Sequence, residues 1–254
     1  MSPLPRMILI SGWAHDASAL EKLRRCLEKN ADVSFIATGD LWDADAKIPF
    51  QDSYAHNLAK MIEKRKSPVF ISGWSLGGMI AMETAARRPD LVAGLVLIAT
   101  TPKFCSGRDW PDGMPSGALR IMQRNFKRDP RRALADFLRD VARPLAEKEE
   151  IVALKIEKAC AVNPLELSAG LQYLAEKDLR GEAVKIKAPA LVLHGREDAV
   201  IPVTAGLSLR SLLSNSEMRV YDRCGHGLPW QNPESAAADI KKFLEKCQDR
   251  TYTP

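Results

Sequence analysis

Short apolar runs recur along the chain and predict the strands of a buried sheet. They cover residues 7–11, 31–36, 68–71, 91–98, 190–193 and 217–221. Several of these runs show no polar alternation, which is typical of strands that are covered on both faces, as in a parallel sheet. We therefore expect a mostly parallel sheet at the centre of the protein.

Segments with helical spacing of apolar positions lie between these runs. They cover residues 18–29, 52–64, 79–88 and 233–247, and Asp52 stands where a helix cap is expected. Alternating strands and helices predict an α/β protein with helices on both faces of the sheet and right-handed connections.

Residues 103–187 interrupt the alternation. They contain only helical patterns, broken by Pro111, Pro130, Pro144 and Pro164. The segment is too long for a loop of a compact domain, and it leaves the sheet at the carboxyl edge, where active sites of such folds form. We expect residues 1–102 and 188–254 to form the core, and residues 103–187 to be a helical lid inserted above the site.

A candidate nucleophile lies between one predicted strand and the helix that follows it. Residues 73–77 read Gly-Trp-Ser-Leu-Gly and match the pattern G-x-S-x-G, with Ser75 at its centre. The pattern alone is also compatible with an ordinary glycine-rich turn. A strand before it and a helix after it are the context of a nucleophile elbow, the strained turn that exposes a catalytic serine. We favour the catalytic interpretation.

A serine nucleophile needs a general base, and the base needs an acid to orient it. Asp198 follows a strand in the pattern G-x-x-D-x-x-x-P and is our candidate acid, ahead of its neighbour Glu197. His226 follows the last strand in a glycine-rich loop and is the candidate base. The order Ser, acid, His is that of the α/β-hydrolases.

The other histidines and the cysteines fit structural roles better. We expect His194 to be buried and hydrogen-bonded, His56 to lie on the surface, and His15 to lie near the oxyanion loop without acting as the base. The five cysteines are scattered and never spaced as C-x-x-C, so neither a disulfide framework nor a metal site is expected. Cys224 is interpreted as a packing residue.

Two backbone amides are candidates for the oxyanion hole. The N–H of Leu76 follows the nucleophile, and the N–H of Trp13 lies in the loop after the first strand. These are the two positions from which α/β-hydrolases donate to a tetrahedral intermediate. The indole of Trp13 can also pack beside the turn or line the substrate pocket.

Composition and charge limit the possible partners and location of the protein but do not change the predicted fold. The chain has 254 residues and a formal charge of +5, which is too mild to indicate a nucleic-acid binder. No apolar run reaches the roughly 18 residues that a membrane span requires, and the first residues lack a signal-peptide profile. We expect a cytoplasmic protein that needs no cofactor.

Taken together, these residues resemble the pimeloyl-acyl-carrier protein methyl ester esterases of biotin synthesis, within the α/β-hydrolases. The matching pieces are Gly-Trp at 12–13, Gly-Trp-Ser-Leu-Gly-Gly at 73–78, Ala-Thr-Thr-Pro-Lys-Phe at 99–104, Asp-Trp-Pro at 109–111, Asp198, Gly-His at 225–226 and Phe-Leu at 137–138. One departure is Ser11, where the family usually has histidine.

The resemblance implies hydrolysis of the methyl ester of a pimeloyl group on acyl-carrier protein, with Phe137 and Leu138 lining the acyl site. Plain packing within the lid is the alternative for these two residues. Basic residues outnumber acidic ones between Lys103 and Arg143, which favours an acidic protein partner. The candidates for carrier binding are Arg124, Arg128, Arg131, Arg132 and Arg139, although each can equally belong to a solvated helix face.

Other functions stay open at this point. A short-chain carboxylesterase or a carbon–carbon bond hydrolase would share the triad, because the fold does not fix the substrate. A lyase of the menaquinone pathway would need a basic pocket near Ser75. A non-catalytic receptor built on the same fold is disfavoured by an intact triad. We expect a monomer that acts on a small-molecule or carrier-bound ester.

Overall fold

A six-stranded parallel sheet forms the centre of the molecule. The structure is a computed structural model that describes residues 4–43 and 50–251. All strand pairings in these residues are parallel, in the order β2-β1-β3-β4-β5-β6. The strands are β1 (Arg6–Ile10), β2 (Asp32–Ile36), β3 (Val69–Trp74), β4 (Val92–Ile98), β5 (Ala190–Gly195) and β6 (Ser216–Tyr221).

Burial of the strands follows their place in the sheet. Every residue of β3 and β5 is buried, as expected for apolar runs covered on both faces, whereas the residues of edge strand β6 are all partly or fully exposed. The register pairs Gly73 of β3 with Ile10 of β1 and with Leu97 of β4. The turns that follow these three strands therefore meet at one edge of the sheet.

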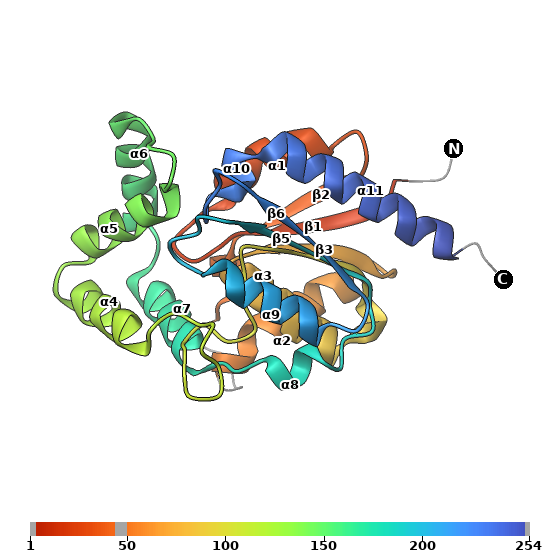
Figure 1. The fold of residues 1–254 in the computed structure, drawn as a ribbon, viewed down its shortest axis with the longest axis horizontal. Helices are drawn as coiled ribbons and strands as arrows, with labels where there is room; N and C mark the ends of the chain where they lie inside the picture. Colours follow the sequence, from red (N-terminus) through yellow and green to blue (C-terminus); the bar gives the residue numbers. More distant parts are fainter. Residues whose placement is uncertain (1–3, 44–49, 252–254) are drawn as a thin grey trace.

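Helices cover both faces of the sheet, which confirms the predicted α/β architecture (Figure 1). The helices α1 (Glu21–Leu27) and α11 (Pro233–Thr251) pack against each other on one face. On the other face lie α2 (Phe50–Glu63), α3 (Leu76–Arg87) and α9 (Val203–Leu212).

Two of the predicted helices begin elsewhere than expected. The segment 18–29 is divided into a 3₁₀ turn, η1 (Ala17–Leu20), and α1, with the side chain of Asp16 accepting from the N–H of Ser18 at the start. Helix α2 begins at Phe50, so Asp52 lies inside its first turn and does not cap it. Instead, Asp52 pairs with Arg87 and Lys177, which no local pattern predicts.

The segment between β4 and β5 is helical, and most of it lies beyond one edge of the sheet (Figure 1). It contains α4 (Ser116–Arg128), α5 (Pro130–Ala142), α6 (Glu149–Cys160), α7 (Pro164–Glu176) and α8 (Arg180–Ala183). Pro130 and Pro164 are the first residues of their helices, where a fixed φ is favourable and no N–H is needed. The side chains of Asp129 and Asn163 cap the same two helices.

A buried carboxylate joins this segment to the core. Glu83 of α3 is 1% exposed and accepts from the hydroxyl of Tyr173 at 2.6 Å and from the Lys177 ammonium at 2.5 Å. Arg87 pairs with the same carboxylate at 2.8 Å. Because α3 begins at the candidate nucleophile, these contacts fix α7 to the helix that positions the serine.

Candidate active site

Ser75 lies on a strained turn between the end of β3 and the start of α3. Its φ of 55° and ψ of −120° fall where side chains other than glycine are rare. A Cβ on Gly73 would lie 2.3 Å from the carbonyl oxygen of Gly77, and one on Gly77 would lie 2.5 Å from that of Ser11. The glycines of the pattern are therefore required by close backbone approach, as a nucleophile elbow demands.

Three polar side chains form a continuous hydrogen-bonded chain at this turn. The hydroxyl of Ser75 lies 2.9 Å from Nε2 of His226, and Nδ1 of His226 lies 2.9 Å from Oδ2 of Asp198. All three residues are buried. A carboxylate can only accept, so Nδ1 carries the proton and Nε2 is free to accept from the serine.

Asp198 is held in its charged form. Its Oδ1 accepts from the backbone N–H groups of Val200 and Ile201, each at 2.8 Å. Burial alone would raise the pKa of Asp198, but His226 and His194 beside it hold the pKa of this carboxyl well below its usual range. His194 is fully buried, and its Nε2 donates to the carbonyl of Ile201 at 2.9 Å.

The loop after β1 lies directly against the elbow. A Cβ on Gly12 would be 3.1 Å from the Cβ of Ser75, so the loop that carries the amide of Trp13 passes directly beside the serine. Among the described residues, the amides of Trp13 and Leu76 donate to no backbone carbonyl outside the helices and strands. Two uncommitted donors beside a nucleophile are what an oxyanion requires.

Hydrogen bonds fix the shape of this loop. The hydroxyl of Ser11 donates to the carbonyl of His15 at 2.8 Å, and Nδ1 of His15 donates to the carbonyl of Trp13 at 2.8 Å. His15 is 8% exposed, and burial lowers its pKa to about 3. Its ring packs on Trp74 with centroids 4.6 Å apart and does not line the pocket described next. We therefore interpret His15 as a residue that stabilises the loop after β1.

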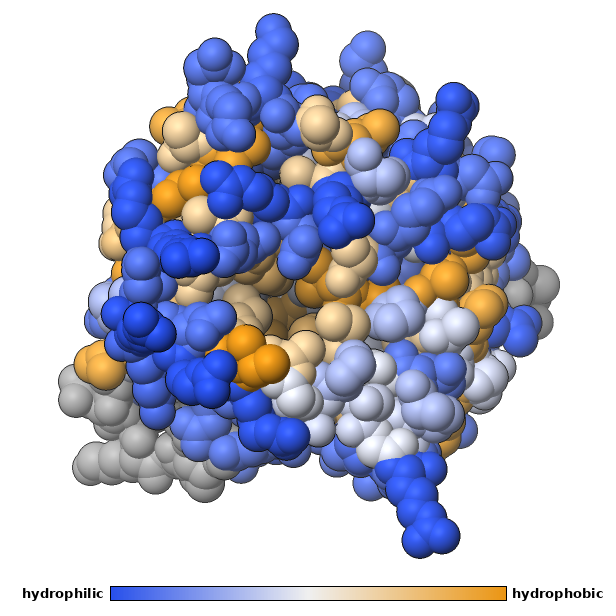
Figure 2. All heavy atoms as spheres, turned by 60° about the vertical axis from the view of Figure 1, so that its left-hand side comes forward, coloured by the Kyte–Doolittle hydropathy of each residue, from blue (hydrophilic) through white to orange (hydrophobic). Residues whose placement is uncertain are grey.

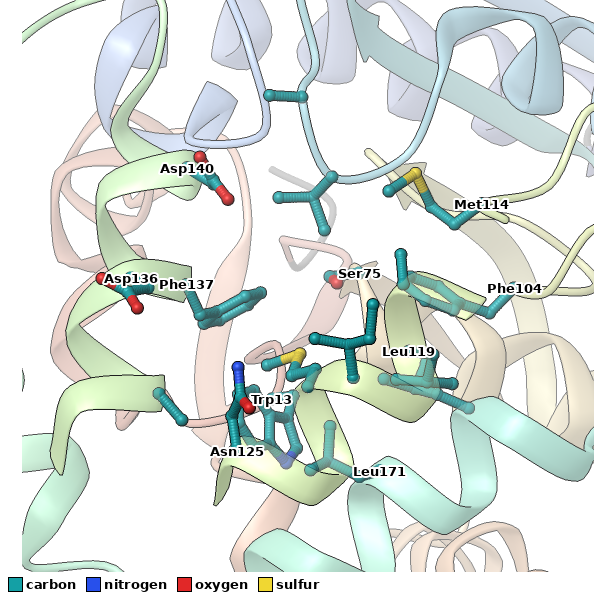
Figure 3. Close-up of a pocket in the computed structure, with 17 residues that line it drawn as sticks. Trp13, Ser75, Phe104, Met114, Leu119, Asn125, Asp136, Phe137, Asp140 and Leu171 are labelled. Atoms are coloured by element: carbon teal, nitrogen blue, oxygen red, sulfur yellow. The ribbon is translucent and has the colours of Figure 1, made fainter. Parts of the chain in front are cut away.

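An apolar pocket of about 220 Å³ leads to Ser75. Its walls come from the β1 loop, from the residues before α4, from α4, α5 and α7, and from the turn after Asp198 (Figure 3). The lining residues other than Ser75 are Trp13, Phe104, Met114, Ala118, Leu119, Ile121, Met122, Asn125, Ala133, Asp136, Phe137, Asp140, Leu171, Leu174, Ala199 and Val200. Figure 2 shows a hollow with hydrophobic walls in the middle of a largely hydrophilic face.

The two predicted acyl-site residues of α5 differ in position. Phe137 lines the pocket, and its ring meets the indole of Trp13 edge-on with centroids 4.9 Å apart. Leu138 is 3% exposed and does not line the pocket, so its prediction as an acyl contact needs correction. Neighbouring residues on a helix point about 100° apart. The side chain of Leu138 therefore packs into the hydrophobic core instead.

The five predicted carrier-binding arginines are all exposed. Arg131 pairs with Glu157, and Arg139 pairs with Asp136 at 3.6 Å. None of the five lines the pocket. They lie on or beside α4 and α5, the two helices that carry much of its wall.

Several pocket residues were not predicted from the sequence. Ala118, Met122 and Asn125 lie three or four residues apart on α4 and form one face of that helix. This spacing was visible in the sequence. However, it does not distinguish a pocket wall from ordinary packing between helices.

Comparison with known proteins places the chain in a family. A family model described as serine aminopeptidase, S33, matches residues 44–234. A pimeloyl-acyl-carrier protein methyl ester esterase of Nitrosomonas europaea is 30% identical over 87% of this chain and 88% of that protein. The chain belongs to this esterase family.

Other comparisons agree with this family. Another such esterase, from Nitrosospira multiformis, is 27% identical over 94% of both chains. The solved structure of a hydrolase from Oleispira antarctica matches 96% of this chain and 92% of that one with a TM-score of 0.86, at 17% identity. That structural likeness confirms the α/β-hydrolase fold.

Proposed function

We propose that this protein hydrolyses the methyl ester of a pimeloyl group attached to acyl-carrier protein, through an acyl-enzyme on Ser75. Membership of the esterase family makes it a carboxylic ester hydrolase. The observation that carries the proposal is the chain Ser75–His226–Asp198 at the base of an apolar pocket. A pimeloyl chain is apolar between its two carbonyl groups, and this pocket matches it.

In the first step, Ser75 attacks the ester carbonyl. His226 takes the hydroxyl proton at Nε2, and Asp198 orients the ring and stabilises its charge. The amides of Trp13 and Leu76 donate to the oxyanion of the tetrahedral intermediate. His226 then gives the proton to the departing methoxide, so methanol leaves and the acyl group stays on Ser75.

In the second step, water attacks the acyl-enzyme. His226 takes a proton from the water, and the second tetrahedral intermediate is held by the same two amides. Its collapse returns the proton to Ser75 and releases the free carboxyl group. The buried side chains of this chain supply every proton transfer, and the pKa of Asp198 keeps its carboxylate charged throughout.

For the carrier protein, the proposal rests on the names of the relatives and on charge. The curated relatives from Nitrosomonas and Nitrosospira carry acyl-carrier protein in their names. In the proposal, Arg124, Arg128, Arg131, Arg132 and Arg139 attract an acidic carrier, and the segment at residues 103–187 acts as a lid. Exposed charges of this kind raise association rates more than they tighten a complex.

The proposal also covers the compartment in which the protein acts and its oligomeric state. No described helix has the length and apolar character that crossing a membrane requires. In our proposal the enzyme acts in the cytoplasm, because its substrate is a product of acyl-chain elongation on a carrier protein. We also propose that it acts as a monomer. Biotin assembly would use the carboxyl group that hydrolysis frees.

Growth rescue tests this function. The gene is expressed in a biotin-requiring strain that lacks its own methyl esterase, with Ser75→Ala as the matched control. We expect the wild-type protein to restore growth without biotin and the variant, made at the same level, to fail. If soluble wild-type protein cleaves simple aryl esters in extracts of that strain yet does not restore growth, the biotin assignment is wrong and a general carboxylesterase is favoured.

A further inference from the structure

Two acidic residues with exposed side chains are among those that line the pocket leading to Ser75. Asp136 and Asp140 are one helical turn apart on α5; in Figure 3, Asp136 lies to the left of Phe137 and Asp140 above it. Four residues of helix advance about 6 Å. The two carboxylates therefore follow each other along one wall, and among the residues that line this pocket no lysine or arginine accompanies them.

Their ion pairs only partly offset this charge. Asp136 lies 3.6 Å from Arg139, and Asp140 lies 3.8 Å from Arg143. Both pairs join exposed side chains three residues apart, and such pairs are weak and mobile. Arg139 and Arg143 do not line the pocket, whereas Asp136 and Asp140 do. A ligand in the pocket therefore contacts the aspartate of each pair rather than the arginine.

A negative wall discriminates between ligands by their charge. A unit charge about 6 Å away in water changes an affinity roughly threefold, and two such charges change it up to about tenfold before salt screening. Apart from Ser75 and Asn125, the other residues of the wall are apolar, and none of them carries a positive charge that would offset the two aspartates. Rejection of the wrong ligand is as effective a source of specificity as attraction of the right one.

We propose that Asp136 and Asp140 are specificity-determining residues that exclude esters whose acyl chain ends in a free carboxylate. This inference rests on the proposed function and names the substrate class of the same site. A dicarboxylic acid that is methylated at one end and free at the other is rejected. The same chain is accepted when its far end is uncharged, as in a thioester to a carrier.

A series of three methyl esters with equal chain length tests this directly. The probes are methyl heptanoate, the monomethyl ester of heptanedioic acid and methyl 7-aminoheptanoate, whose far ends are neutral, negative and positive. For the wild-type protein at low salt we expect kcat/KM of the negative ester to be about three- to tenfold below that of the neutral one. The positive ester should equal or exceed the neutral one. Added salt should narrow the differences.

The double variant Asp136→Asn/Asp140→Asn should raise the ratio of negative to neutral kcat/KM at least threefold. A ratio within one protein is used because any general loss of activity cancels. The control Glu149→Gln/Glu150→Gln removes two charges from the exposed start of α6, away from the pocket, and should leave the ratio as in the wild type.

The inference would be overturned by equal kcat/KM for the three esters in the wild type, by a ratio insensitive to salt, or by the same ratio in the double variant. No turnover of the neutral ester would also overturn it. The proposed function is tested separately by hydrolysis of the carrier-bound methyl ester. If the carrier-bound ester is not hydrolysed but kcat/KM of the three small esters follows the predicted order, the carrier assignment is wrong. The inference that Asp136 and Asp140 exclude negatively charged esters then still holds.

Discussion

The indole N–H of Trp74 donates to the backbone carbonyl of His226 at 2.8 Å. This bond joins the residue before the candidate nucleophile to the candidate base, across 152 positions of sequence. Both residues are buried, and the two rings also lie 5.5 Å apart. The turn that positions Ser75 therefore also holds the loop that carries His226.

We predict that Trp74→Phe lowers kcat about fivefold and changes KM little. Phenylalanine keeps most of the packing but loses a buried hydrogen bond of about 1 kcal/mol, which frees the His226 loop. The matched control is Trp110→Phe, which loses a similar indole bond to the carbonyl of Lys103 at 2.9 Å, outside the pocket. Steady-state kinetics on a simple ester measure both. Equal losses in the two variants would contradict a positioning role for Trp74.

Neighbouring residues of α5 should separate binding from stability. Phe137→Ala removes a pocket wall and should raise KM for a seven-carbon acyl ester several-fold, with a small effect on folding. Leu138→Ala leaves a cavity in the core and should lower the free energy of unfolding by about 2–4 kcal/mol, with KM near the wild-type value. Urea titration and kinetics on both variants check this. The reverse assignment of effects would show that the helix is rotated from its described position.

Glu83 should matter for stability far more than an exposed glutamate. Glu83→Gln leaves Lys177 and Arg87 beside a buried neutral group, so we expect the free energy of unfolding to fall by about 3 kcal/mol. The control is Glu63→Gln, whose exposed partner is Arg88, with an expected loss below about 1 kcal/mol. Urea midpoints of the two variants would be compared. Similar midpoints would mean that the link between α3 and α7 adds little to stability.

His15 should make the protein less stable in acid. Because its folded pKa of about 3 is below the unfolded value near 6.5, the unfolded chain binds the proton first as pH falls. Stability from the neutral ring is complete above pH 6.5 and is lost progressively toward pH 3. Between pH 7 and pH 5 this loss is on the order of 2 kcal/mol.

The variant His15→Gln should therefore lose less stability than the wild type over this pH range. Urea unfolding at pH 7 and pH 5 measures the difference, and His56→Gln, on the exposed surface of α2, is the control. The control should follow the wild type. If the two variants show the same pH dependence, the buried His15 ring is not the group that responds.

The sequence predicted the fold and the three residues of the hydrogen-bonded chain because their signals are local. Ser75, Asp198 and His226 each follow a strand, and parallel strands bring their carboxyl ends to one edge. The glycines on both sides of Ser75 indicate a tight turn, because neighbouring backbone approaches these positions too closely for a side chain. Such patterns carry over from sequence to structure without knowledge of distant neighbours.

Features that depend on distant contacts could not be predicted in the same way. Asp52 has the chemistry of a helix cap, yet its partners Arg87 and Lys177 lie on α3 and just beyond α7. Leu138 and Phe137 share a helix, and only the docking of α5 decides which of them meets the pocket. The bond from Trp74 to His226 is equally invisible in the sequence, because both ends must first be placed by the sheet.

Hydrolysis of the methyl ester of pimeloyl-acyl-carrier protein by the purified enzyme tests the central claim most directly. Mass spectrometry of the carrier would follow the loss of the methyl group, with Ser75→Ala as the control. We predict complete conversion to the free carboxyl form by the wild-type protein and none by the variant. Wild-type protein that cleaves simple esters but leaves the carrier-bound ester intact, or conversion by Ser75→Ala at the wild-type rate, would contradict the account.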